Sequence, residues 1–220
     1  MRRSAALTIV AIVVSGLVGS IPATASGQTT PTTTPTTTPT TTRTHRVVVR
    51  PVDAAGQPSP GFTVHRQRGQ KVTCEHSAQS AVDDGIYVCT PAAVYLLACW
   101  PSQHHTVLCL RDARNTKMLR LSYSGTLRQV KAPARPSPRA LDLRGNTCEE
   151  RVPGLDWGRQ RSHPHWVGFY SCTHGDLWGP PSGDGINRSH EPWTVHFFGF
   201  ERSHPDGTRA VRTAYFVGTA

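Results

Sequence analysis

Histidine is the residue type with the most obvious capacity for chemistry in this chain of 220 residues, which contains 11 of them. Four lie in one compact stretch, at His163, His165, His174 and His190. Three imidazoles that meet at one point could hold Zn²⁺ or Cu²⁺ and so support hydrolysis. Pro164 separates the first two, however, and indicates a turn in place of a strand that would direct both rings to one face. A metal-dependent hydrolase is therefore an alternative hypothesis, beside the simpler expectation of exposed polar histidines.

Signatures of established enzyme classes are missing from the sequence. His190 and Glu191 are followed by His196, six residues after the first histidine, whereas the zinc-protease signature requires four, and Pro192 would break its helix. The sequence also lacks a G-x-S-x-G motif, a phosphate-binding P-loop and a dinucleotide glycine fingerprint. We therefore predict a protein that is not an enzyme and that needs no cofactor.

The five tryptophans offer flat apolar surfaces on which sugar rings can stack. Trp166 and Trp193 lie in β-rich runs, which predicts that they belong to the core. Trp157 and Trp178 lie beside glycine and proline, which favours loops. If these two loop indoles are exposed and roughly coplanar, they would form the binding face of a glycan-binding module.

The charge balance is basic, with 24 Lys and Arg against 14 Asp and Glu and a formal net charge of +10. The cations gather in two groups, which are Arg46, Arg50, Arg66, Arg68 and Lys71, and then Arg128, Lys131, Arg135 and Arg139. A positive surface attracts polyanions through fields that salt screens. No recognised nucleic-acid-binding motif accompanies the charge, so we expect acidic cell-wall polymers or glycans as partners and no specific nucleic acid. Arg135 and Arg139 are the candidate ligand-binding cations, beside the two loop tryptophans.

The N-terminus has the order of a secretory signal peptide over residues 1–25. Two arginines precede the apolar run Leu7–Val14, and Ala23-Thr24-Ala25 supplies a small-residue cleavage site. The apolar run is shorter than the ~20 residues that a membrane span needs, although an uncleaved N-terminal anchor is the alternative. No later segment is long and apolar enough to span a membrane. The sequence predicts a protein that is secreted or associated with the cell wall, without a transmembrane segment after cleavage.

Residues 26–45 form a tract of threonines interrupted by proline at every fourth position, at Pro31, Pro35 and Pro39. Such a tract has little to bury and favours extended geometry, which predicts a disordered linker. It could equally be a wall-crossing stalk whose hydroxyl groups carry sugars. We expect a basic, extended entry segment to follow over residues 46–69.

The remaining sequence, residues 70–220, has the texture of an all-β domain. Short β-rich runs begin in the entry segment at 46–52 and continue through the domain. Turn-forming residues separate them about every ten positions, at 71–74, 85–89, 94–99, 106–110, 117–123, 140–143, 166–171, 193–200 and 210–217. This pattern predicts a sandwich or barrel-like fold. Three prolines make Gln129–Arg139 an extended strap. The strap divides the domain into halves, about 70–128 and 140–220, which form two sheets of one domain or two small β subdomains.

Six cysteines follow the signal peptide, and their even number in an exported chain indicates disulfides. Fifteen pairings are possible, of which short loops favour the sequential one. It joins Cys74 to Cys89, Cys99 to Cys109, and Cys148 to Cys172. A metal site or a nucleophilic thiol is the alternative, but the sequence has no C-x-x-C motif and no odd cysteine.

Several segments of residues 70–220 combine cysteines and aromatic residues at characteristic spacings. They are Cys89-Thr90-Pro91, Ala98-Cys99-Trp100, Thr106–Asp112, Trp166–Cys172, Gly183–Arg188, Pro192–Val195 and Thr213–Gly218. In these segments the chain resembles a group of exported actinobacterial proteins, common in mycobacteria, to which no function has been assigned. The resemblance implies export and disulfides, and it implies no catalytic residues.

Overall fold

The structure is a computed structural model, and it describes residues 43–90, 96–151, 163–200 and 206–220. These residues form strands β1 to β13 and contain no helix, so the predicted all-β class is confirmed. Within the described part of the chain, no helix is available that could cross a membrane. The predicted signal peptide, most of the Thr/Pro linker and Trp157 lie outside the described residues.

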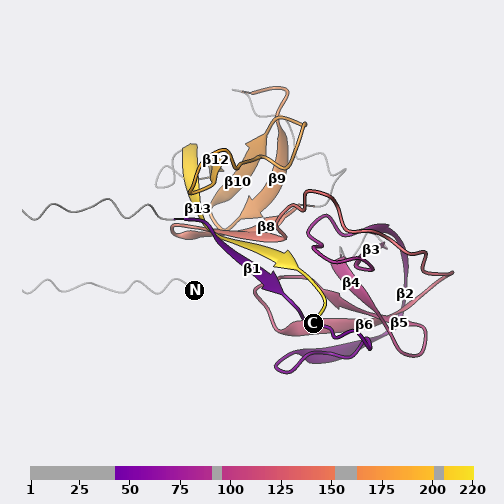
Figure 1. Cartoon of the computed structure of the whole chain (residues 1–220). Coiled ribbons are helices and arrows are strands. Elements are labelled where there is room, and N and C mark those ends of the chain that lie inside the picture. Colours follow the sequence, from indigo (N-terminus) through magenta and orange to yellow (C-terminus); the bar gives the residue numbers. More distant parts are fainter. Residues whose placement is uncertain (1–42, 91–95, 152–162, 201–205) are drawn as a thin grey trace, which may run out of the picture. The chain divides into compact units, whose positions relative to one another are not determined.

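Five strands close into the first barrel, in the order β2-β3-β4-β5-β6 (Figure 1). Their bounds are β2 Thr63–Ser77, β3 Tyr87–Thr90, β4 Leu96–Ser102, β5 Thr106–Leu110 and β6 Lys117–Tyr123. Consecutive strands are antiparallel, whereas β2 and β6 pair in parallel. The parallel pair follows from the odd number of strands, because in an up-and-down series the first and the fifth run in the same direction.

Two disulfides lie inside the first barrel. Cys74 is directly opposite Cys89 across β2 and β3, and Cys99 is opposite Cys109 across β4 and β5. Their Cα–Cα distances of 4.2 and 4.0 Å fit the narrow pairs of an antiparallel ladder. These four cysteines pack with buried residues such as Val107. The sequential disulfide pairing is confirmed for this barrel.

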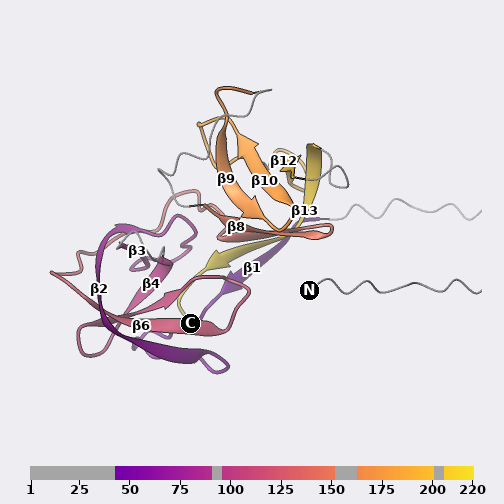
Figure 2. The same ribbon diagram turned by 180° about the vertical axis from the view of Figure 1, so that it is seen from behind.

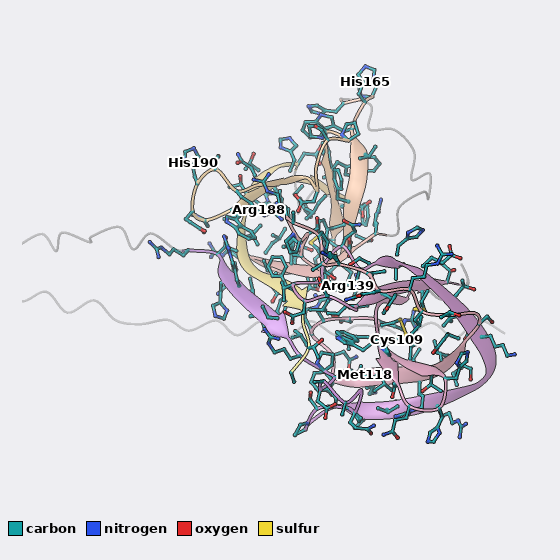
Figure 3. The ribbon with its side chains drawn as sticks, turned by 45° about the vertical axis from the view of Figure 1, so that its right-hand side comes forward. Cys109, Met118, Arg139, His165, Arg188 and His190 are labelled. Carbon is teal, nitrogen blue, oxygen red and sulfur yellow. A yellow bond between two sulfur atoms is a disulfide. The ribbon has the colours of Figure 1, made fainter. Side chains whose placement is uncertain are left out.

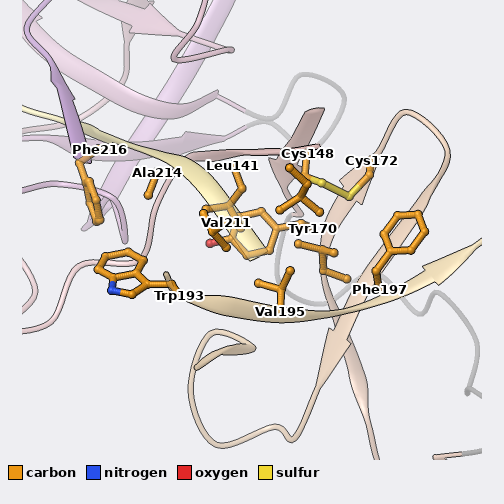
Figure 4. Close-up of a cluster of buried hydrophobic side chains, with 12 residues drawn as sticks. Leu141, Cys148, Tyr170, Cys172, Trp193, Val195, Phe197, Val211, Ala214 and Phe216 are labelled. Atoms are coloured by element: carbon orange, nitrogen blue, oxygen red, sulfur yellow. A yellow bond between two sulfur atoms is a disulfide. The ribbon is translucent and has the colours of Figure 1, made fainter. Parts of the chain in front are cut away.

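The remaining strands form an eight-stranded sheet in the order β1-β13-β7-β8-β9-β10-β12-β11. Their bounds are β1 His45–Val49, β7 Ala140–Leu143, β8 Asn146–Glu150, β9 Val167–Cys172, β10 Gly175–Gly179, β11 Ile186–Asn187, β12 Thr194–Gly199 and β13 Gly207–Val217. An additional pairing of β12 with β13 closes this sheet into the second barrel. Its interior holds the third predicted disulfide, Cys148–Cys172, with Tyr170, Val195 and Phe197 around it (Figure 4).

The long strand β13 joins the two barrels into one folded unit, residues 40–220. Its last residue, Val217, forms a bridge with Ala81 and packs with Trp100 and Met118 on the first barrel. On its other side β13 pairs in parallel with β1, which lies alongside it in both views (Figure 1; Figure 2). The segment 46–69, expected to be an extended entry, therefore contributes most of β1 and the first residues of β2.

The predicted strap, residues 129–139, crosses from the first barrel to the second without belonging to a strand. Main-chain hydrogen bonds fix it along its length, from the N–H of Gly85 to the carbonyl of Val130 at 3.0 Å and from the N–H of Ser137 to the carbonyl of Gln79 at 2.9 Å. At its end, the hydroxyl of Tyr170 donates to the carbonyl of Pro138 at 2.8 Å. The strap is thus held in place before it enters β7.

Candidate functional site

A cleft of about 610 Å³ lies between the strap and the second barrel, and we call it the strap cleft. The strap contributes Arg135 and Ser137, and the second barrel contributes Trp166 just before β9, the end of β10, the loop after β10, β11, β12 and the start of β13. Its volume falls in the range of small-molecule sites, which run from about 300 to 1,000 Å³.

Glycines shape the wall that follows β10. A Cβ at Gly185 would lie 2.6 Å from Cδ2 of Phe169, and the φ of +72° at Gly185 is one that glycine adopts without strain. A Cβ at Gly179 would lie 3.0 Å from the Cα of Gly185. The loop can therefore fold closely over Phe169 only because these two positions lack side chains.

Arg188 is a cation of this wall whose interactions are internal. Its guanidinium forms a bidentate ion pair with Asp184, with one contact of 3.2 Å. It also donates to the carbonyl of Pro136 in the strap at 3.4 Å and lies 4.9 Å from the ring centre of Trp193. Asp184 neutralises its charge, so Arg188 ties the loop to the strap and offers little to a ligand.

Arg135 is the contrasting cation. It is exposed, it lines the cleft from the strap, and it makes no hydrogen bond or ion pair with another described residue. Among the residues that the structure describes, the charged side chains of the strap cleft are Arg135, Arg188 and Asp184. The guanidinium of Arg135 is therefore available to an anion.

Aromatic rings form the opposite wall. Trp166 is half-buried, its ring stacks on His163 at a centroid distance of 3.9 Å, and it forms a T-shaped contact with His196 at a centroid distance of 4.8 Å. Burial lowers the pKa of His196, the nearby His163 lowers it further, and Asp206 opposes both effects. The lowered pKa favours the neutral form of His196 at pH 7.

The exposure of Trp178 and Trp166 is the reverse of what the sequence predicts. Trp178 lies in β10 and is only 4% exposed, so the expectation of an exposed loop residue is wrong, although its ring lines the cleft. Trp166, expected in the core, precedes β9 and is the more exposed indole of the two. Trp193 is buried as predicted. The pairing of β10 with β9 has an irregular register between Leu177 and Trp178. No local sequence pattern predicts this irregularity.

Arg139, the second candidate ligand-binding cation, does not line the cleft. Its side chain is buried between the two barrels, where it donates to the carbonyls of Arg111 and Glu150 (Figure 3). The expectation that it lies on a ligand-binding surface is corrected. Its position has a sequence signal, because Arg139 alternates with Leu141 and Leu143, which are both buried in the second barrel.

Glu150 is a titratable group that the sequence analysis did not single out. It lies opposite Tyr170 in the ladder of β8 and β9 and shares a side of its strand with Cys148, so its carboxyl points toward the end of the second barrel. Burial raises the pKa of Glu150 to about 7, with a further increase from Asp184 and an opposing effect of Arg139.

The four histidines of the metal hypothesis are not brought together. His165 and His190 lie on different parts of the second barrel (Figure 3), and His174 lies in the turn after β9, where its N–H donates to Asn146. Among the described residues, the one group of three potential ligands within 4.8 Å is Cys89, Cys99 and Cys109. Their sulfur atoms are in disulfides, so they offer no thiolate to a metal.

Comparison of the chain with protein-family models, with curated proteins and with solved structures gave no match. The three disulfides are typical of proteins that mature in an oxidising compartment outside the cytosol.

Proposed function

We propose that this is an exported, non-enzymatic protein that binds acidic polymers of the cell envelope along its strap. The observation that carries the proposal is that Arg135 is exposed, lines the cleft and pairs with no acidic group of the described residues. Lys131 in the strap and Arg128 just before it are also exposed, so three positive charges follow one stretch of chain without strands. Such a row attracts an extended polyanion through a field that salt weakens.

The compartment part of the proposal rests on the signal-peptide pattern, on the resemblance to exported actinobacterial proteins and on the three disulfides. The Thr/Pro tract would then hold the folded unit away from its point of attachment or release. Together these features support the proposal that the basic strap meets acidic wall polymers outside the cell.

A second candidate function is glycan binding without a requirement for charge. The position of Trp166 favours it, because a half-buried indole at a cleft provides an apolar surface for a sugar ring. The two functions differ in their response to salt, because stacking is insensitive to ionic strength and ion pairing is not.

Co-sedimentation of the purified protein with isolated actinobacterial cell envelope, across a salt series, tests the first candidate. We expect retention at low salt that is lost by about 0.3 M, where the Debye length is several ångströms. The variant with Arg128, Lys131 and Arg135 all changed to Gln should bind roughly tenfold more weakly at low salt, which corresponds to about 1.4 kcal/mol.

The matched control removes three charges from exposed positions of the first barrel, with Arg66, Lys71 and Lys117 changed to Gln. It should retain most of the binding. Equal losses in the two triple variants would show that net charge alone matters and would refute the strap as the contact. Retention that resists salt would favour the glycan-binding function, and no retention at any salt would eliminate envelope binding.

A further inference from the structure

Resting on the proposed envelope binding, we propose that the strap cleft accepts a sugar that carries a negatively charged group. The anion pairs with Arg135, and the sugar ring packs against Trp166. Envelope binding alone requires only a row of positive charges, whereas this proposal names a site and a ligand class.

The charge arrangement favours an anion at one defined place. Both carboxylate oxygens of Asp184 are committed, because they face Arg188 and one of them also accepts from the N–H of Ile186 at 3.2 Å. A cationic ligand would therefore meet no free carboxylate among the described lining residues, while Arg135 repels it. An anionic group would find the planar fork of Arg135, which suits carboxylate and phosphate oxygens alike.

The aromatic wall is already positioned for a ligand. Stacking against His163 and the edge contact with His196 hold the indole of Trp166 in one orientation. A fixed indole loses little conformational entropy when a ligand packs against it. Because burial and the nearby His163 lower the pKa of His196, this imidazole is neutral at pH 7 and does not compete with Arg135 for the anion.

Six neutral residues with hydrogen-bonding side chains also belong to the described lining, beside apolar residues and glycines. They are Gln79, Ser137, Ser182, Asn187, Thr194 and Thr208. Hydroxyl and amide groups can both donate and accept, which matches the hydroxyl groups of a sugar. A simple anion would use Arg135 and leave these groups unused, so the composition of the whole lining favours a sugar with a charge over an inorganic ion.

Binding measured by tryptophan fluorescence and calorimetry on the purified protein tests the proposal. The probes are a trimer of galacturonic acid, its methyl ester, which keeps the rings and lacks the charge, a hexose phosphate and inorganic phosphate. We expect the acidic trimer to bind at least tenfold more tightly than its ester. The hexose phosphate distinguishes a phosphate from a carboxylate as the preferred anion.

Two variants and a control assign the binding to this cleft. Arg135→Gln should abolish the discrimination between acid and ester, and Trp166→Ala should weaken both. Arg66→Gln, which removes an exposed charge from the first barrel, should change neither. Because Trp166→Ala could disturb the fold through His163, the exposed Arg135 provides the decisive variant.

The proposal is overturned if the acid and the ester bind alike, if none of the sugars binds, or if inorganic phosphate binds as tightly as the best sugar. In each case, salt-sensitive retention of the protein on the cell envelope would show that the proposed function survives without this ligand class. Loss of that retention as well would overturn both.

Discussion

Replacing Arg139 by methionine is expected to lower the free energy of unfolding by about 3–5 kcal/mol, the usual cost of removing one partner from a buried charged contact. Arg139 is 4% exposed, and its guanidinium donates to Arg111 at the end of the first barrel and to Glu150 in the second. Methionine fills a similar volume but leaves both carbonyl groups without this donor. The two barrels would lose a polar connection that water cannot replace.

Chemical denaturation at pH 8 measures the effect, with Arg111→Gln as the matched control. The side chain of Arg111 is exposed, so its removal should cost within about 0.5 kcal/mol. The double variant Arg139→Met with Glu150→Gln should recover part of the loss, because Glu150 is then no longer a charge without its cation. A loss below about 1 kcal/mol for Arg139→Met would contradict the structural role that we assign to it.

Glu150 is expected to make the protein less stable as the pH rises. The pKa of this carboxyl is about 7 in the folded protein against the ordinary 4.5, so between these values the folded state holds a proton that the unfolded state has released. Stability contributed by this proton is complete below pH 4.5 and is lost as the pH rises through 7. The pKa of Glu150 is thus about 2.5 units higher in the folded than in the unfolded state. At 1.36 kcal/mol for each pKa unit, this difference lowers the free energy of unfolding by up to about 3 kcal/mol as the pH rises.

Glu150→Gln keeps the shape of the side chain and removes the titration. The difference in unfolding free energy between this variant and the natural protein should grow in favour of the variant from pH 5 to pH 8. Glu149→Gln is the control, because Glu149 is on the other side of β8, pairs with Arg114 at 2.9 Å, and leaves Glu150 in place. In Glu149→Gln, the free energy of unfolding should still fall as the pH rises, as it does in the natural protein. Parallel stability curves for Glu150→Gln and the natural protein would refute the buried protonation.

The amino-acid sequence determined the features that depend on neighbouring residues. The strands at 106–110, 117–123 and 140–143 are found at their predicted bounds, because alternating or β-branched residues with turns between them specify strands locally. The disulfides follow for the same reason, since short connections place the paired cysteines opposite each other on adjacent strands. Local sequence patterns therefore predicted both the all-β class and the pairing of the cysteines.

Strands without a local pattern were decided by tertiary pairing. β8 consists of Asn146–Glu150, whose polar residues do not resemble a buried strand, and β10 begins and ends with glycine. Each is held between two other strands of the second barrel, which supply the hydrogen bonds that intrinsic propensity does not favour. The same holds at Thr44, near the end of the predicted linker, whose hydroxyl donates to Val211 at 2.9 Å across 167 positions.

The candidate site depended almost wholly on the tertiary structure. Sequence reasoning identified Arg135 through its charge, but only the folded chain brings Arg135 to the cleft that Trp166 lines. Sequence reasoning likewise did not distinguish the exposed Arg135 from the buried Arg139, which lie four positions apart on the strap. The physical reason is that exposure depends on what packs against a residue: Arg139 enters the seam between two barrels, whereas Arg135 faces a cleft that forms only when the strap lies against the second barrel.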